Sequence, residues 1–185
     1  MRAKNWSENV RFATEPAWQY VDEWGKAVGA STPASALPSV YLHPGQLVVA
    51  TQPMQVTTIV GSCVAVCLWD PFLSIGGTNH FLLPTGLKTS GARLKYGNIA
   101  TEELVERLVQ AGARVGRLRA KLFGGACVLE AMQGTANHLG QKNVQAAREA
   151  LAKAGIPIVD EDVGGSHGRK LIYHPHEGCA LVKLL

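Results

Sequence analysis

Short apolar runs bounded by turn residues recur along the chain and predict a protein rich in β-strands. Each run contains Val, Ile, Leu or aromatic residues and is too short for an ordinary helix. Asp70-Pro71 is a turn signal between two of these runs, and residues 174–178 are expected to form the turn between the last two. The expected strands are 47–50, 55–60, 64–69, 76–83, 117–123, 156–159, 170–174 and 179–184.

Three segments instead carry patterns typical of helices. Thr101 is expected to begin a helix that runs to about residue 111, because Leu104 and Leu108 repeat on one face. A second helix is expected over 140–154, and a short one over 16–27. Many strands with few helices predict an α+β fold in which mostly antiparallel, layered, sandwich-like β-sheets are flanked by helices.

The composition divides the chain into a short extension and one domain. Residues 29–38 are small residues and prolines, which is typical of a linker. We therefore expect an N-terminal extension and linker over 1–38 and a single domain over 39–185. The 185 residues, 46% hydrophobic and 17% charged, are sufficient for one domain with a substantial core.

The charge of the chain is modest, with a net value of +4, and most basic residues are scattered. Between residues 114 and 121 they cluster but alternate with apolar residues, which predicts a strand with one solvated face. We expect no nucleic-acid partner, since no aromatic residues interleave with these charges. A mildly basic surface would instead help to attract an acidic partner.

The hydropathy pattern gives no sign of a membrane protein. No stretch of about 18 consecutive apolar residues occurs, so we expect no membrane insertion. Residues 1–8 lack the apolar run of a signal peptide. The expected location is cytoplasmic.

The four cysteines lack the C-x-x-C pairs of zinc sites, and disulfides are not expected in a cytoplasmic protein. We interpret Cys67, Cys127 and Cys179 as core or semi-buried thiols. The histidines of residues 174–178 are expected to belong to a turn rather than to a metal cluster. No metal and no cofactor is expected.

Cys63 and His80 are the most informative pair of residues in the chain. Cys63 follows a Gly-Ser turn, and His80 lies on the return strand of the hairpin that turns at Asp70. With a tight turn, Asp70 faces Leu73 and Cys63 lies opposite His80, with Cβ atoms roughly 5 Å apart. A longer loop from Asp70 to Ile75 would shift the pairing by about two positions, which is still within reach of long side chains. In either register we expect the two side chains to approach each other.

The pair has two interpretations. Cys63 and His80 are either a nucleophile and its base or a small core thiol and a buried polar ring, because free cysteines are commonly buried and inert. In the first case His80 takes the thiol proton, and a neighbouring imidazolium lowers the pKa of Cys63. The backbone around Gly61 and Ser62 would then supply N–H donors to an oxyanion, since glycine permits close approach.

Several ordered motifs around these residues resemble the CheD family, the chemoreceptor glutamine deamidases of bacterial chemotaxis. They are T-T-I-V-G-S-C-V-A-V-C-L-W-D-P from Thr57, G-G-T-N-H-F-L-L-P from Gly76, K-L-F-G-G-A from Lys121, L-G-Q-K-N from Leu139, and D-V-G-G with G-R-K between 162 and 170. Position 139 holds Leu where the family pattern has Ile. The resemblance covers roughly residues 40–185 and is more specific than any single motif.

The resemblance implies a catalytic cysteine, histidine and threonine and a fold of the same α+β class. These residues fall on Cys63 as the nucleophile, His80 as the general base and acid, and Thr57 as an orienting or substrate-binding group. Thr58 also lies beside the site, but the family's threonine precedes the cysteine by six positions, which selects Thr57.

The implied reaction is hydrolysis of glutamine side-chain amides on the cytoplasmic helices of methyl-accepting chemotaxis receptors. It gives glutamate and ammonia through a cysteine thioester, with a methylesterase-like activity on receptor glutamyl esters as a secondary expectation. The alternative is a non-catalytic adaptor that binds a CheC-type phosphatase or a receptor. A thiol protease would use the same nucleophile but cleave the backbone.

Overall fold

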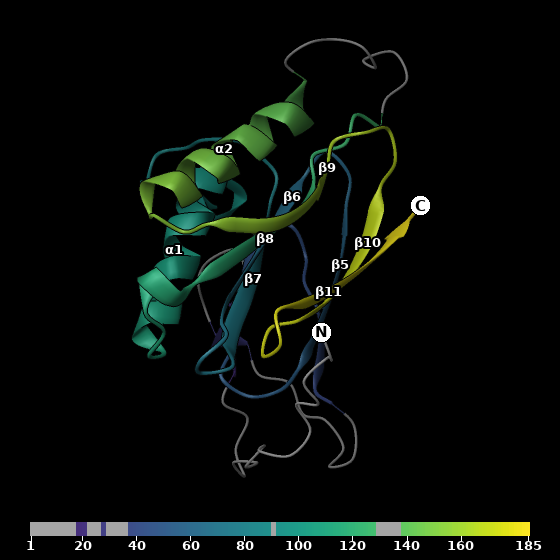
Figure 1. Cartoon of the computed structure of the whole chain (residues 1–185). Helices are drawn as coiled ribbons and strands as arrows, with labels where there is room; N and C mark the ends of the chain where they lie inside the picture. The colour runs from purple at the N-terminus through teal and green to yellow at the C-terminus, as the bar shows by residue number, and fades with distance from the viewer. Residues whose placement is uncertain (1–17, 22–26, 29–36, 90–91, 129–137) are drawn as a thin grey trace.

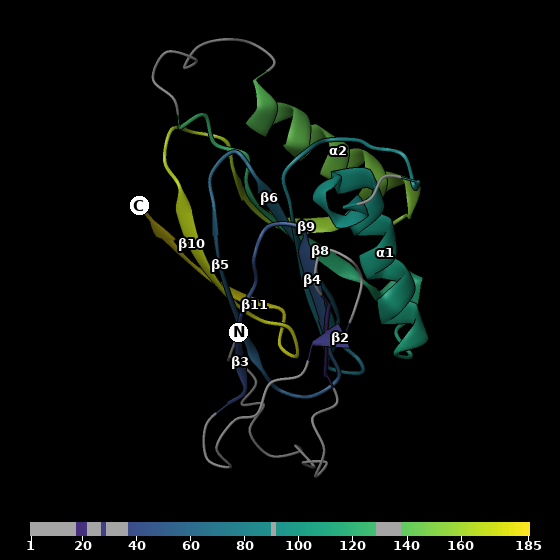
Figure 2. The same cartoon turned by 180° about the vertical axis from the view of Figure 1, so that it is seen from behind.

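The computed structural model describes residues 18–21, 27–28, 37–89, 92–128 and 138–185. Its elements form three layers (Figure 1): a pair of helices, a seven-stranded sheet and a four-stranded sheet. Helices α1 (Gly97–Gln110) and α2 (Leu139–Lys153) cover one face of the larger sheet, and the smaller sheet covers its other face. Figure 2 shows the same order of layers from behind. The predicted α+β class is confirmed.

Both sheets are mainly antiparallel, and the parallel pairs are β3 with β5 and β8 with β9. The larger sheet has the order β2 (Ala27–Val28), β1 (Trp18–Val21), β4 (Gln46–Ala50), β7 (Ile75–Phe81), β6 (Val64–Asp70), β8 (Arg119–Gly124) and β9 (Ile158–Val163). The smaller sheet has the order β11 (Cys179–Leu184), β10 (Arg169–His174), β5 (Gln55–Val60) and β3 (Ser39–Tyr41). Short 3-10 helices span Arg93–Lys95 and Val115–Arg117.

Strand β6 is apolar along nearly its whole length because both of its faces are covered. Val64 and Val66 belong to the core cluster that includes residues of the helices. Ala65 and Cys67 alternate with them and pack instead with Tyr173 of β10, between the two sheets. A strand buried on both faces reads as a continuous apolar run, which explains why this hairpin was recognisable in the sequence.

The expected strands are confirmed, although several of their ends shift, and β3 was not expected. Strand β7 ends at Phe81 rather than at residue 83, and β8 begins at Arg119 because a 3-10 helix spans Val115–Arg117. Helix α1 begins at Gly97 rather than Thr101, because Asn98 forms two hydrogen bonds with Gly86 and Gly97 lies against the Phe81 ring. Strand β9 begins two residues later than expected, since Ile156 is a buried core residue whose N–H still bonds the carbonyl of Leu151.

The helix expected over 16–27 is wrong. Within that segment the structure describes β1, which pairs with β4, and β2, which pairs with β1. Trp, Tyr and Val favour strands, and the free edge of β4 gives such a segment hydrogen-bonding partners. Two strands of the expected extension therefore join the larger sheet. The boundary at residue 38 stays a prediction, because 29–36 lie outside the described residues.

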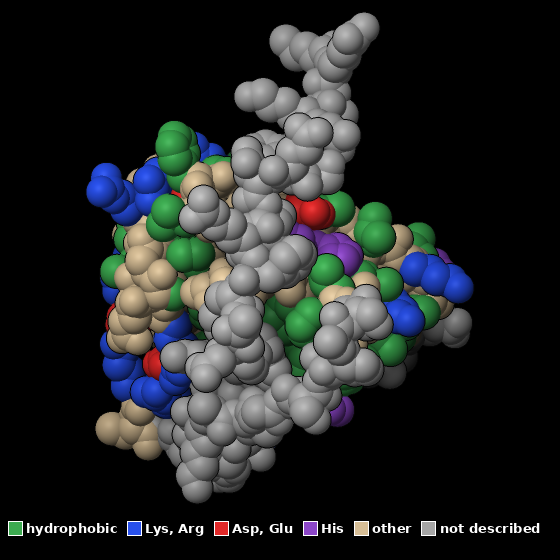
Figure 3. All heavy atoms as spheres, turned by 90° about the horizontal axis from the view of Figure 1, so that it is seen from below, with side chains coloured by type: hydrophobic (Ala, Val, Ile, Leu, Met, Phe, Trp, Pro, Cys, Tyr) green, Lys and Arg blue, Asp and Glu red, His purple; other side chains and the backbone are tan. Residues whose placement is uncertain are grey.

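The surface carries the scattered basic residues that the composition predicts. Figure 3 shows Lys and Arg side chains in separate groups near the margins of one face, with hydrophobic side chains between them.

Among the described residues, no helix is long and apolar enough to cross a bilayer. All four cysteines are free thiols. Cys67 is buried and Cys127 half-buried, as expected, but Cys179 is exposed because it begins the edge strand β11.

Candidate active site

The turn that carries Cys63 is anchored through its carbonyl groups. It occupies residues 61–63, between β5 of the smaller sheet and β6 of the larger one, and Cys63 is half-buried. The carbonyls of residues 61, 62 and 63 accept hydrogen bonds from Ala126 N, Asn143 Nδ2 and Gly125 N, each at 2.8 Å. Three successive carbonyls are therefore turned toward the body of the protein.

Gly124 is required for this close approach. A Cβ atom at this position would lie 2.2 Å from the carbonyl oxygen of Cys63, and its φ of +108° is strained for any other residue. The carbonyl of Gly124 accepts from the N–H of Gly164, and the carbonyl of Gly165 accepts from the N–H of Cys127. Gly124 and Gly125 therefore lie against the Cys63 segment, and Gly164 and Gly165 bond to the end of β8 and the residues after it.

His80 lies on the central strand β7, and the hairpin has the longer of the two registers considered. Asp70 pairs with Ile75 and Ala65 pairs with His80, so the tight-turn register is wrong. The buried carboxylate of Asp70 explains the difference, because it accepts from the N–H of Phe72 and so shapes the wider loop. Strand β6 begins at Val64, so Cys63 lies just outside this register, on the side of His80. Within the described residues Nε2 of His80 makes no hydrogen bond to the Cys63 sulfur, and the approach of the two side chains stays a prediction.

A threonine of the other sheet fixes the tautomer of His80. The hydroxyl of Thr58 donates its single proton to the carbonyl of Leu42 at 2.7 Å. The same oxygen lies 2.8 Å from Nδ1 of His80 and can therefore only accept there. Nδ1 consequently carries the ring proton, and Nε2 carries a lone pair. Within the described part of the chain, Nε2 is buried and has no hydrogen-bond partner.

The threonine hydrogen-bonded to the imidazole is Thr58, whereas the role expected of Thr57, orienting or substrate-binding, stays a prediction. Successive side chains of a strand point to opposite faces. In β5 the buried positions are 56, 58 and 60, so Thr58 faces the larger sheet whereas the half-buried Thr57 lies on the outer face of the smaller sheet.

Burial keeps both members of the pair uncharged at neutral pH. It lowers the pKa of His80 to about 4, although the Leu42 carbonyl opposes this shift. It also raises the pKa of the Cys63 thiol, an effect that the backbone N–H of Cys63 itself partly offsets. The expectation that an imidazolium lowers the pKa of Cys63 is therefore wrong for the resting protein, because His80 is too deeply buried to hold a proton.

Asn143 of α2 is a site residue that the sequence analysis noted only as part of a motif. Its Nδ2 donates to the carbonyls of Ser62 and Leu82, at 2.8 Å each. A sequence signal for it exists, because position 143 shares the buried face of the helix with positions 140 and 147. A polar residue on an apolar helix face requires a buried hydrogen-bond partner.

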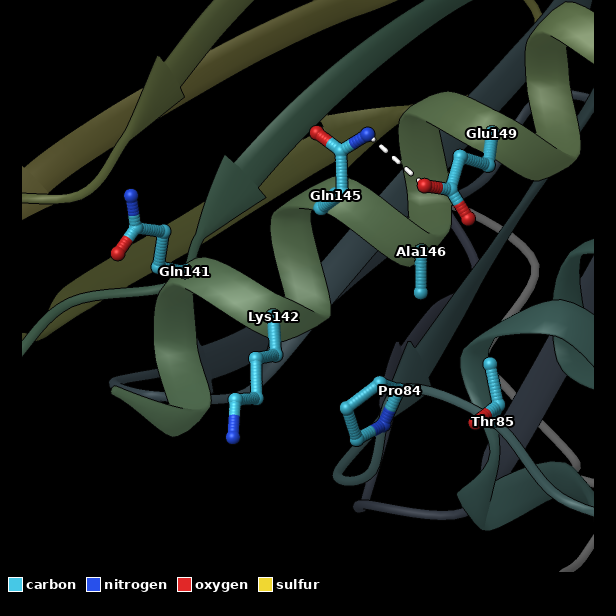
Figure 4. Close-up of a pocket in the computed structure, with 7 residues that line it drawn as sticks. All are labelled: Pro84, Thr85, Gln141, Lys142, Gln145, Ala146 and Glu149. Atoms are coloured by element: carbon cyan, nitrogen blue, oxygen red, sulfur yellow. Dashed lines mark hydrogen bonds between the residues drawn. The ribbon is translucent and has the colours of Figure 1, made fainter. Parts of the chain in front are cut away.

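A groove lies between α2 and the segment after β7 (Figure 4). Gln145 donates a hydrogen bond to Glu149 along its rim at 2.9 Å. The residues that form the groove include neither Cys63 nor His80. They are Pro84, Thr85, Gln141, Lys142, Gln145, Ala146 and Glu149.

The histidines near the C-terminal end of the chain form a turn, as predicted. Residues 175–178 connect β10 to β11, with Glu177 N–H bonded to the carbonyl of His174. In the described ranges, no group of three His, Cys, Asp or Glu side chains is arranged to hold a metal ion.

The fold and the site define an α+β protein with a thiol on an anchored turn and a neutral, tautomer-fixed imidazole on the adjacent strand. The chain belongs to the CheD family. The family described as CheD chemotactic sensory transduction matches residues 82–184. This match begins just after His80, and longer similarities to individual proteins include the Cys63 segment.

Two relatives illustrate that similarity. The "Probable chemoreceptor glutamine deamidase CheD 1" of Anaeromyxobacter dehalogenans (strain 2CP-C) is 47% identical over 164 residues, which cover 89% of this chain and 95% of the relative. The "Probable chemoreceptor glutamine deamidase CheD" of Burkholderia orbicola (strain MC0-3) is 43% identical over 80% of this chain and 61% of its own length. A crystal structure of the Bacillus licheniformis hypothetical protein YfiH is similar over 64% of this chain and 49% of its own, with a TM-score of 0.40 and 19% identity.

Proposed function

We propose that this chain is a protein-glutamine deamidase that hydrolyses glutamine side-chain amides of methyl-accepting chemotaxis receptors through a thioester on Cys63. Membership of the CheD family and the deamidase names of its relatives support the substrate. The observation that carries the chemistry is the buried Nε2 of His80, which is held as a lone-pair acceptor by the Thr58 hydroxyl.

In the proposed reaction, the neutral pair exchanges a proton only when the substrate is attacked. Nε2 of His80 takes the thiol proton as the sulfur of Cys63 bonds to the amide carbon. The imidazolium then donates that proton to the departing nitrogen, and ammonia leaves. Water, deprotonated by the same Nε2, attacks the thioester, releases glutamate and restores the thiol. The route uses side chains and backbone only, with no cofactor.

The anchored turn supports the proposed oxyanion donors. In a planar trans peptide the C=O and N–H groups point in opposite directions. The carbonyls of Gly61 and Ser62 are turned into the protein, so the N–H groups of Ser62 and Cys63 are turned away from it. In the described part of the chain, no hydrogen bond to another residue's backbone uses them. Two such donors suit the charge that develops on an amide oxygen.

The test is receptor deamidation by the full chain. A receptor cytoplasmic fragment should release ammonia and gain the small mass change of glutamine to glutamate in an intact peptide. Cys63→Ala and His80→Ala should abolish both signals, whereas Cys179→Ala, which removes an exposed thiol of β11, should retain them. Full activity of Cys63→Ala or His80→Ala contradicts the mechanism.

Two further outcomes would contradict the proposed activity. Cleavage of the fragment's backbone would identify a thiol protease. Absence of turnover together with binding of a receptor fragment or a CheC-type phosphatase would support an adaptor.

A further inference from the structure

Asn143 joins the two chain segments that carry the proposed nucleophile and base. Its side chain is fully buried, and both hydrogens of its amide are used. One goes to the carbonyl of Ser62, directly before Cys63, and the other to the carbonyl of Leu82, two positions after His80. These acceptors are 81 and 61 residues away in sequence, so the contacts exist only because the helix packs across the end of the hairpin.

The bond to Ser62 sets the direction of one particular N–H group. The carbonyl of Ser62 and the N–H of Cys63 belong to the same planar peptide unit. When Asn143 holds the carbonyl toward the helix, the N–H of Cys63 must point the opposite way. This N–H favours the ionised form of the Cys63 sulfur and so lowers the pKa of the thiol, although burial raises that pKa by more. The N–H therefore lies on the same side as the sulfur.

Asparagine suits this position better than other polar residues. Both groups to be held are carbonyl oxygens, and a terminal amide offers two donors from a single nitrogen. An aspartate at the same place would present only acceptors when ionised. The Oδ1 atom of Asn143 is buried and has no hydrogen-bond partner among the described residues. Its lost hydration destabilises the folded state, so stability alone does not explain an asparagine at this position.

We propose that Asn143 is a positioning residue, which aligns the N–H of Cys63 as an oxyanion donor and fixes the spacing between the Cys63 turn and the His80 strand. This inference rests on the proposed deamidase function. Asn143 touches neither the substrate nor the sulfur, and it acts through the peptide unit between residues 62 and 63.

The matched experiment compares Asn143→Ala with Asn98→Ala. Asn98 also makes two long-range hydrogen bonds to backbone, both with Gly86, but these do not involve the Cys63 turn. Asn143→Ala should lower kcat on a receptor fragment by a factor on the order of 100, with little change in KM, as expected for a misaligned reacting group. Asn98→Ala should stay within a few-fold of wild type.

A second readout does not depend on turnover. The rate at which iodoacetamide alkylates Cys63, followed by peptide mass spectrometry against pH, reports the pKa of that thiol. Without its fixed N–H, the midpoint should move to higher pH in Asn143→Ala and stay unchanged in Asn98→Ala. Melting curves establish that each variant is folded, and Asn143→Ser replaces the alanine variant if the latter does not fold.

The outcomes separate this inference from the proposed function. Equal kcat and equal alkylation midpoints for folded variants at positions 143 and 98 would overturn the positioning role. If wild type lacks deamidase activity, the proposed function fails, yet a shifted midpoint in the Asn143 variant would still establish that Asn143 orients the N–H of Cys63.

Discussion

The hydroxyl of Thr58 decides which nitrogen of His80 is available as a base. Its only proton is committed to the Leu42 carbonyl, so the imidazole must donate from Nδ1 and keep its lone pair on Nε2. The family resemblance selected Thr57 for an orienting or substrate-binding role, which stays a prediction. Strand alternation shows that only one of two neighbouring threonines can face the larger sheet, but which one does so is set by how the two sheets pack, and a register shift of one residue exchanges them.

The first prediction concerns these two threonines. Thr58→Val keeps the side-chain shape but removes the hydroxyl that hydrogen-bonds both the Leu42 carbonyl and Nδ1 of His80, so the protein should lose about 1–3 kcal/mol of stability. The variant should also lose its preference for the Nδ1–H tautomer, which nitrogen NMR of labelled histidine detects. Thr57→Val, on the outer face, should change stability by less than about 0.5 kcal/mol and leave the tautomer intact. The same tautomer in Thr58→Val would refute the assignment.

At the level of secondary-structure elements, the junction of β8 with the following glycines determines where the Cys63 turn lies. Strand β6 was predictable because both of its faces are covered and its residues form an apolar run. The start of α1 was not, since Gly97 is placed by its contact with the Phe81 ring rather than by periodicity. Likewise β1 forms because it pairs with β4, and the local sequence of β1 does not predict that pairing.

The second prediction uses glycines of this region. Gly124→Ala should destabilise the protein by about 1–3 kcal/mol, because the added methyl group meets the Cys63 carbonyl and the backbone has a positive φ. It should also reduce activity by displacing the Cys63 turn. Gly116→Ala is the control, since a Cβ there has no neighbour within 4 Å, and its free energy of unfolding should change by less than about 0.5 kcal/mol. Urea unfolding measures both, and equal midpoints would contradict the role of Gly124.

For the molecule as a whole, the proposed base lies inside the core rather than at the bottom of an open pocket. His80 is 1% exposed and lies between the two sheets, where Tyr173 also donates a hydrogen bond to the Leu68 carbonyl across the same layer. The sequence predicted the layered class, but not the depth at which His80 lies. His80 is this deeply buried because one sheet packs on the other. Burial then makes its imidazole neutral, whereas the sequence analysis expected an imidazolium.

The third prediction is a dependence of stability on acid. The unfolded chain binds a proton on His80 near pH 6.5, whereas the folded chain does so only near pH 4. Between these values the unfolded state holds more protons, so stability should decrease as pH falls through this window, by up to about 3 kcal/mol from this group. His80→Gln should show a smaller slope in urea titrations at several pH values. Identical slopes would mean that His80 is already protonated in the folded protein.

Because the Cys63 thiol is uncharged in the free protein, we expect it to react slowly with peroxide. Oxidation to sulfenic acid proceeds from the thiolate, and burial disfavours that form in the free protein. Cys67 is also protonated, because burial raises the pKa of its thiol to about 12. The sulfur of the proposed nucleophile should thus react slowly with oxidants in the free protein, because the burial that disfavours its ionisation also removes the reactive thiolate.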